Sequence, residues 1–549
     1  MIKVLLNGEE KTFDQPTRIF DMYDFSDKKY IAVKVNNRIR ELAYIVTNDA
    51  TIELLDLTNQ DAARLYQATL RYLIHMATYK VFPNARLIFD YSVSRAIFAR
   101  IEGLDHDFMQ EDLDLIEEEL KKIIAADYKI NRNTITKKEA IDFYTKIGET
   151  SKVEVIKYKP EDTVHIYDCA GYKNYMFGYM LYSTGYIKDY NLRLYSPGFL
   201  ISYPRAECGG RIPSFNDEKV FRLTLIKAAN WARISKAETL AELNDIVKNG
   251  KALEFINICE AKHNRQLSEL GADIQANIET TKLICVAGPS SSGKTTFTNR
   301  LRIELMSRGI TPLMISLDNF YKNPKFCPIG PDGKPDFEDI DALNRKLLDE
   351  CIYKLISGAE VRLPIYDFTT STTSYMEPVK LSKNQVIMIE GIHALNDKLT
   401  PSIPESLKYK VYIAPLGQYR IDDYNPISIS DIRLLRRIVR DYMTRATDCE
   451  KTLSFWKSVR AGEFKWIYPY QNDADFVFNS ELTYELCVLK KYALPLLNEV
   501  KKDSPNYITA TRLTSFLKYY LEISDKWIPC NSVLREFIGG SIFYTKDKI

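Results

Sequence analysis

The stretch KLICVAGPSSSGKT, residues 282–295, decides the fold of the C-terminal half of the chain. It opens with a short apolar run that is typical of a buried strand, and the segment TTFTNRLRIEL at its end indicates a helix. Between the two, residues 288–295 satisfy the pattern G-x-x-x-x-G-K-[ST]. Glycines let the backbone curl so that successive N–H groups point at phosphate oxygens, and the helix adds the positive end of its dipole. The stretch therefore predicts a loop that binds a nucleoside triphosphate, and the flanking strand and helix argue against a chance match in a Gly/Ser turn.

Every residue of this loop is a candidate contact for ATP. Lys294 has the reach to meet the β- and γ-phosphates, and the hydroxyl of Thr295 is of the type that holds Mg²⁺. The residues that we expect to bind ATP here are Gly288, Pro289, Ser290, Ser291, Ser292, Gly293, Lys294, Thr295 and Thr296.

The sequence after the loop alternates between predicted strands and helices, which is typical of a parallel α/β sheet. The strands of this sheet are expected at 282–287, 312–317, 386–390 and 409–414. Asp318 ends the second strand, and ligands in open α/β sheets bind at the carboxyl ends of strands. A carboxylate there can accept the proton of an attacking hydroxyl, so Asp318 is a candidate general base. The alternative is that Asp318 only caps a turn with Asn319.

Six segments resemble, in the same order, motifs of the uridine kinase and phosphoribulokinase family. They are SLDNFYK (316–322), PDFEDIDALN (335–344), LPIYDF (363–368), VIMIEGI (386–392), DIRLLRRIVRD (431–441) and ADFVFN (474–479). The resemblance covers residues 281–480 and implies a P-loop kinase that uses ATP and Mg²⁺. It implies a nucleoside acceptor, with a uridine- or cytidine-like base favoured, and a phosphoribulokinase-like sugar phosphate as the alternative.

The resemblance also assigns roles to individual residues. It makes Asp318 the general base, and it places Glu338 where a carboxylate holds ribose hydroxyls. Tyr321 and Tyr366 would contact the sugar or base, although ordinary packing at a strand end is the alternative for Tyr366. Glu390 would support Mg²⁺ through the water shell of the metal.

One departure from the family pattern bears on the base. Uridine kinases typically carry a histidine after the YDF segment, whereas this chain continues TTSTT with Ser371. The sequence therefore leaves the base preference open.

Four arginines are expected on one face of the helix at 431–441. They are Arg433, Arg436, Arg437 and Arg440, at positions i, i+3, i+4 and i+7. Their guanidinium groups would repel one another without an anion among them, which suggests a bound triphosphate. We expect Arg437 to act in catalysis with Lys294 and Asp318, Arg436 and Arg440 to bind ATP, and Arg433 to bind the substrate.

The N-terminal half has a different pattern. Residues 1–62 resemble the β-grasp (TGS) module of threonyl-tRNA synthetases, and the segments at 71–83 and 111–124 resemble their second additional domain, which has an editing fold. That domain carries an H-x-x-x-H pair on its first helix, where this chain has Tyr72 and Met76. His75 is out of register by one residue, so we expect no editing activity.

The expected fold class is therefore α/β, with a P-loop parallel sheet flanked by helices and preceded by an α+β half. The expected divisions are 1–62, a TGS-like module; 63–210, an editing-like domain; 211–280, a helical connector; 281–484, the kinase domain; and 485–549, a helical extension.

The composition limits the partners of the protein. With 75 basic and 73 acidic residues the net charge is only +2, so RNA binding by the N-terminal half stays open but is not favoured. Nine scattered cysteines without a C-x-x-C pair fit reduced thiols in the cytoplasm. No apolar run is long enough for a membrane helix, and the N-terminus turns polar too early for a signal peptide. A homo-oligomer is left open. The leading interpretation is a cytoplasmic ATP-dependent nucleoside kinase, and the rival is an RNA-sensing or regulatory P-loop NTPase.

Overall fold

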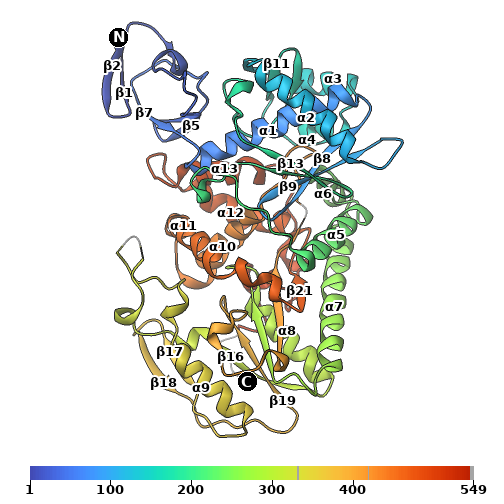
Figure 1. Ribbon diagram of the computed structural model, residues 1–549, viewed down its shortest axis with the longest axis vertical. Coiled ribbons are helices and arrows are strands. Elements are labelled where there is room, and N and C mark those ends of the chain that lie inside the picture. Colours follow the sequence, from blue (N-terminus) through green and yellow to red (C-terminus); the bar gives the residue numbers. More distant parts are fainter. Residues whose placement is uncertain (331–332, 418, 545–549) are drawn as a thin grey trace.

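The computed structural model describes residues 1–330, 333–417 and 419–544. Figure 1 shows the N-terminal half at one end of the molecule and the P-loop half at the other, with helices from the C-terminal region between them.

The first module is a five-stranded sheet with the strand order β2-β1-β7-β4-β5. Its strands are β1 (Ile2–Leu6), β2 (Glu9–Phe13), β4 (Ala32–Val35), β5 (Arg38–Arg40) and β7 (Ala50–Leu55), with a small ribbon of β3 (Thr17–Arg18) and β6 (Ile45–Val46) beside it. The inward side chains of β1 alternate with exposed ones, which is why its sequence reads as a half-buried strand.

The second module packs helices on two antiparallel sheets, ordered β13-β14-β9-β8 and β10-β11-β12. The helices are α1 (Gln60–Val81), α2 (Gln110–Ala125), α3 (Lys137–Lys146) and α4 (Thr150–Lys157). The strands are β8 (Arg86–Val93), β9 (Ala96–Glu102), β10 (Ile130–Thr136), β11 (Thr163–Cys169), β12 (Tyr172–Asn174), β13 (Asn191–Tyr195) and β14 (Gly198–Ser202). Asn59 starts α1, because its side chain accepts the N–H groups of Asp61 and Ala62.

The connector is helical, as predicted, but it is divided into three helices. They are α5 (Lys219–Ile234), α6 (Leu240–Lys248) and α7 (Ala252–Ala276). Thr239 and Glu242 form a reciprocal capping box that starts α6, and Gly250 has a positive φ of 72° in the turn before α7. Figure 1 shows α7 running along one side of the molecule from α6 toward the P-loop sheet.

The P-loop half contains a five-stranded sheet in the order β16-β19-β15-β20-β21, with every neighbouring pair parallel. Its strands are β15 (Leu283–Ala287), β16 (Thr311–Ser316), β19 (Gln385–Glu390), β20 (Lys408–Ala414) and β21 (Phe476–Asn479). The associated helices are α8 (Lys294–Ser307), α9 (Arg345–Ile356), α10 (Ile429–Arg445) and α11 (Cys449–Trp466), and a hairpin joins β17 (Pro364–Asp367) to β18 (Thr372–Tyr375). The predicted α/β fold and all the strands named from the sequence are confirmed.

The C-terminal region is not a separate unit at the edge of the molecule. Its helices α12 (Glu485–Asn498), α13 (Tyr507–Leu517) and α14 (Arg535–Ile538) share one hydrophobic core with α10. Both α12 and α14 contact α10 directly. No helix of the described residues is long and apolar enough to cross a membrane.

Residues 419–427, just before α10, join the two halves. Asp422 accepts from Lys152 Nζ at 3.0 Å, and neither side chain is exposed to solvent. The Tyr424 ring lies edge-on to His75 at 4.3 Å between ring centroids, and its hydroxyl donates to Glu149 at 2.7 Å. His75 thus packs against a residue of the other half. This agrees with the interpretation of His75 as a packing residue that lies out of register with the H-x-x-x-H pair.

Candidate functional site

The phosphate loop lies between the end of β15 and the start of α8. Its two glycines are required by space and conformation: a Cβ on Gly288 would lie 2.0 Å from the Ile413 carbonyl oxygen, and Gly293 has a φ of 90°. The loop therefore follows the path that the sequence motif predicts.

Several buried hydroxyl groups in and beside the loop have no hydrogen-bond partner within the described part of the chain. Among the described residues, the hydroxyls of Ser291, Ser292 and Thr296 are buried without a hydrogen-bond partner. Buried polar groups normally have partners, so these hydroxyls fit a ligand with many acceptor oxygens, such as a phosphate chain.

Lys294 lies within this cradle. Its Nζ donates to the carbonyl oxygens of Gly288 and Pro289 at 3.0 and 3.1 Å. Burial lowers the pKa of Lys294, and the nearby carboxylates of Glu390, Glu536 and Asp318 oppose that shift. One ammonium group thus faces three carboxylates.

Asp318 and Glu390 lie at the carboxyl ends of the neighbouring strands β16 and β19. Ser316 pairs with Glu390 in the strand register, and its hydroxyl donates to the Glu390 carboxylate at 3.1 Å. Burial and the charge of Asp318 together raise the pKa of Glu390 to about 7, against the opposing effect of Lys294. The protein around Asp318 likewise raises its pKa by partial desolvation, although the side chain keeps contact with solvent, and Lys294 and Arg445 act to lower it.

The turn-capping alternative for Asp318 does not fit. Asp318 lies in a short 3-10 turn, Leu317–Phe320, whose cap is the side chain of Ser316. In the described part of the chain the Asp318 carboxylate makes no hydrogen bond, and the residue is exposed to solvent. Its side chain is therefore free to meet a substrate hydroxyl.

The residues present fit a magnesium ion. The described residues contain no group of three or more His, Cys, Asp or Glu that could hold a metal by themselves. Mg²⁺ in phosphoryl-transfer sites instead takes much of its coordination from phosphate oxygens and water. The Asp318 carboxylate raises the pKa of Glu390, and both carboxylates act on Lys294, so the pair suits an additional cation of this kind.

The predicted acceptor residues Tyr321 and Tyr366 form an aromatic cluster with two exposed rings that were not predicted, Phe337 and Phe368. Tyr321 lies 6.3 Å from Tyr366 between ring centroids, and its hydroxyl donates to the Phe337 carbonyl at 3.0 Å. Tyr366 is only 6% exposed, whereas Phe368, whose ring lies 4.9 Å from that of Tyr366, is 58% exposed. The packing alternative for Tyr366 therefore has support, and Phe337 and Phe368 offer the accessible rings.

Glu338 lies near these rings and near the arginine helix. Burial raises its pKa to about 7, and Arg437 acts to lower it. Gly462 of α11 leaves room for it, since a Cβ there would lie 2.6 Å from the Glu338 Cβ.

The arginine helix requires a correction to the charge argument. Arg433 is ion-paired with Glu463, and Arg436 Nε lies 2.5 Å from Glu485. Arg440 Nη2 lies 3.0 Å from Asp441. Because these carboxylates balance the guanidinium groups, repulsion among the arginines does not require a bound triphosphate.

Three of these arginines nevertheless contact the phosphate loop, and the longest contact is that of Arg436 Nη1, which donates to the Ser291 carbonyl at 3.4 Å. Arg437 Nη1 donates to the Ser290 hydroxyl at 2.7 Å, and Arg433 Nε donates to the Ser290 carbonyl at 2.9 Å. Ser290 also donates its N–H to Glu463 at 3.3 Å. Sequence reasoning missed Glu463 and Glu485, because residues from other elements leave no spacing pattern beside the arginines.

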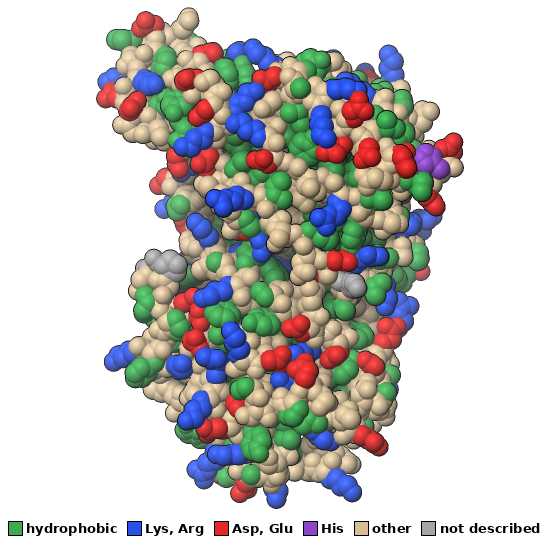
Figure 2. Space-filling view, viewed as in Figure 1, with side chains coloured by type: hydrophobic (Ala, Val, Ile, Leu, Met, Phe, Trp, Pro, Cys, Tyr) green, Lys and Arg blue, Asp and Glu red, His purple; other side chains and the backbone are tan. Residues whose placement is uncertain are grey.

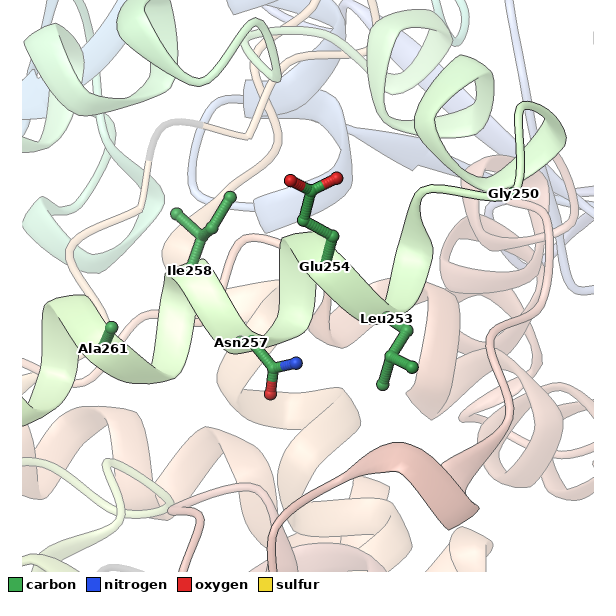
Figure 3. Close-up of a pocket in the computed structure, with 6 residues that line it drawn as sticks. All are labelled: Gly250, Leu253, Glu254, Asn257, Ile258 and Ala261. Atoms are coloured by element: carbon green, nitrogen blue, oxygen red, sulfur yellow. The ribbon is translucent and has the colours of Figure 1, made fainter.

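Figure 3 shows a hollow elsewhere on the molecule. It is lined by a turn and one face of α7, namely Gly250, Leu253, Glu254, Asn257, Ile258 and Ala261. None of these residues belongs to the phosphate loop or the acceptor cluster, so the hollow is not part of the site.

The parallel sheet, the loop after its central strand and the lysine at the start of α8 define a P-loop α/β domain. Residues 283–486 match the family described as "Phosphoribulokinase / Uridine kinase family". This match supports a phosphotransferase with an alcohol group as acceptor, of the nucleoside or sugar kinase kind. Kinases of this family generally use ATP with Mg²⁺.

The N-terminal half has different relatives. The chain is 32% identical over 232 residues to a threonine–tRNA ligase of Acetivibrio thermocellus, covering 42% of this chain and 35% of the ligase. It is 24% identical over 281 residues to that of Clostridioides difficile, covering 50% of this chain and 39% of the ligase. The chain thus spans little more than a third of the length of these relatives.

Solved structures also resemble part of the chain. A possible uridine kinase from Bacillus stearothermophilus aligns with a TM-score of 0.27 at 21% identity, covering 39% of this chain and 98% of that one. D-glycerate 3-kinase from Cryptococcus neoformans aligns with a TM-score of 0.22 at 16% identity, covering 46% of this chain and 87% of that one.

Proposed function

We propose that the protein is a cytoplasmic ATP-dependent nucleoside kinase that transfers the γ-phosphoryl group of ATP to the 5′-hydroxyl of a nucleoside. The observation that carries this proposal is the placement of Asp318 and Glu390 at adjacent strand ends, facing Lys294 of the phosphate loop. This places a candidate base, a candidate metal ligand and a phosphate-binding cation at one edge of the sheet.

Asp318 is the general base in this proposal. Its raised pKa moves the carboxylate toward the range in which a base is effective near neutral pH, while Lys294 and Arg445 keep it from rising further. Because its carboxylate has no hydrogen-bond partner among the described residues, it is free to accept the proton of the acceptor hydroxyl.

Lys294 and Arg437 bind the phosphate chain in this proposal. Lys294 exchanges its two loop carbonyls for phosphate oxygens, and Arg437 is already directed at the loop through Ser290. Arg436 and Arg440, each paired with a carboxylate, lie behind them, and Arg436 also contacts the Ser291 carbonyl of the loop. Thr295 and Glu390 would hold Mg²⁺, which supplies charge neutralisation on the phosphates when bound.

The aromatic cluster supports a nucleoside over a sugar phosphate as the acceptor. Phe337 and Phe368 present exposed rings on which a planar base can stack, and Glu338 suits ribose hydroxyls. A phosphate-bearing acceptor would meet the negative charge of Glu338 in the same place. By the family resemblance, a uridine- or cytidine-like base is favoured.

The second candidate is an RNA-sensing or regulatory P-loop NTPase. The similarity of the N-terminal half to threonine–tRNA ligases favours it. The visible face of the N-terminal half in Figure 2, however, intersperses Lys and Arg with Asp and Glu and shows no continuous basic track for an RNA backbone.

A transfer assay separates the two candidates. The full chain is incubated with Mg²⁺·ATP and each of a panel of nucleosides, with ribulose 5-phosphate as the sugar-phosphate arm and RNA alone as a further arm. Phosphorylation of a nucleoside without RNA supports the proposal. ATP hydrolysis that rises only with RNA, with no phosphorylated nucleoside, would support the regulatory candidate instead.

A further inference from the structure

The C-terminal segment lies directly on the phosphate loop. A carboxylate oxygen of Glu536 accepts the backbone N–H of Thr296 at 3.0 Å. A Cβ on Gly293 would lie 2.3 Å from Val533 Cγ1, so Val533 packs against the loop backbone. The Phe537 ring lies 5.0 Å from the guanidinium of Arg436.

The hydrogen bond to Thr296 uses a group that a nucleotide would need. Thr296 is in the first turn of α8, whose N–H groups have no partner inside the helix and carry the positive end of its dipole. In a P-loop these N–H groups bind phosphate oxygens. The Glu536 carboxylate thus occupies the position of a phosphate oxygen.

Other contacts hold the carboxylate in that place. Glu536 is only 9% exposed, and its charge is close enough to raise the pKa values of Lys294 and Glu390. Tyr544 lies close enough to Thr295, Thr296 and Glu536 for all three to influence it. A triphosphate entering the loop would meet this buried negative charge at close range.

We propose that residues 533–544 act as an internal competitor of the nucleotide, with Glu536 as its phosphate mimic. This inference rests on nucleotide binding by the loop and goes beyond the transfer reaction. ATP must displace Glu536 from Thr296 before the phosphate chain can use the whole cradle.

Displacement is coupled to the arginine helix. The short helix α14 contacts α10, and Phe537 lies against Arg436 of α10. When the segment leaves, α10 loses packing on the side of Arg436. The same event therefore opens the phosphate loop and frees the arginine helix to adjust to the nucleotide.

The test is ATP affinity, measured by calorimetry on the full chain with Mg²⁺ and without any acceptor. Glu536→Gln removes the charge and keeps the shape, so it is expected to bind ATP about tenfold more tightly or better, as for loss of a charged hydrogen bond. Asp525→Asn is the matched control, because the Asp525 side chain lies in the same region but, among the described residues, accepts only from Lys491 and Tyr492. This variant is expected to bind ATP with unchanged affinity. Unchanged or weaker ATP binding by Glu536→Gln overturns the proposal.

A second measurement covers the case in which the variant does not fold. In the wild-type protein, amide hydrogen exchange across 533–544 is expected to rise when ATP binds. Exchange that stays constant or slows contradicts displacement. Neither measurement involves an acceptor, so a failure of nucleoside phosphorylation would not affect either result.

Discussion

Lys152 of the N-terminal half and Asp422 of the P-loop half form an ion pair, 3.0 Å from Nζ to Oδ2, with no exposure of either side chain. Lys152 also donates to the Tyr175 carbonyl at 2.6 Å, and its ammonium lies 4.2 Å from the centre of the Tyr424 ring. Asp422 lies a few residues before α10. The ion pair therefore links the N-terminal half to the segment that directly precedes the arginine helix.

Lys152→Met is expected to destabilise the protein by about 3–5 kcal/mol, because it leaves the buried Asp422 charge without its partner. Chemical denaturation measures this change. Lys122→Met is the control, since Lys122 pairs with Glu118 on the surface and both side chains are well exposed. The double variant Lys152→Met with Asp422→Asn is expected to recover part of the loss, because Asn removes the unpaired charge and keeps an acceptor for Tyr424 N–H and Asn425 Nδ2. Equal effects of the two lysine substitutions would contradict the structural role of the pair.

Asp318→Asn is expected to lower kcat by roughly 10²–10⁴-fold, the range for loss of a general base. ATP affinity should stay near that of the wild type, because the carboxylate does not bind the phosphate chain. Asp367→Asn is the matched control, since Asp367 is exposed and accepts from Thr369 N–H in a turn. Near-normal turnover of Asp318→Asn would show that Asp318 is not the general base.

From the raised pKa of Glu390 we expect that binding of Mg²⁺·ATP releases protons in a pH-dependent way. Its pKa is about 7 in the structure against 4.5 for an ordinary Glu, and a bound cation would lower it again. Binding near pH 6.5 should therefore release protons, which calorimetry in buffers of different ionisation enthalpy detects. Glu390→Gln should reduce the release, and an unchanged proton count would mean that Glu390 is not beside the metal.

The same shift has a consequence for stability without ligand. Between pH 4.5 and 7 the folded protein holds a proton on Glu390 that the unfolded chain has lost. Stability from this group is therefore greatest at low pH and falls as pH rises through 7. Glu390→Gln should flatten this part of the stability profile in the protein without nucleotide, and a profile identical to the wild type would contradict the raised pKa.

Local pattern was enough to predict the sheet and the loop. The strand predicted at 282–287 is Leu283–Ala287, and α8 starts at Lys294 within the predicted motif. Asp318 could be placed near the phosphate loop because parallel strands end at a common edge, whereas the role of Glu390 came from the family resemblance. The break before α6 also had a local signal, the T-x-x-E capping box of Thr239 and Glu242.

Contacts between distant residues could not be predicted in this way. Glu463 and Glu485 balance Arg433 and Arg436 from other helices, and nothing in the arginine spacing indicates them. Glu536 lies 240 residues beyond the Thr296 that it contacts. Such pairings depend on how whole elements pack, so they appear only in the folded structure.

The arginines of α10 should separate into two classes when each is replaced. Arg433→Met leaves the buried Glu463 with Arg460 as its remaining cation, so it is expected to cost about 1–3 kcal/mol of folding stability. Arg437→Met removes a mostly buried side chain, 16% exposed, that contacts the loop through Ser290, and it leaves Asp441 still paired with Arg440. It is expected to leave stability nearly unchanged and to lower kcat by about 10²-fold or more through loss of charge stabilisation on the transferring group. Denaturation curves and steady-state rates on the same two variants check this division. Equal losses of stability, or normal turnover by Arg437→Met, would show that all four arginines serve the packing of α10 and not the phosphate chain.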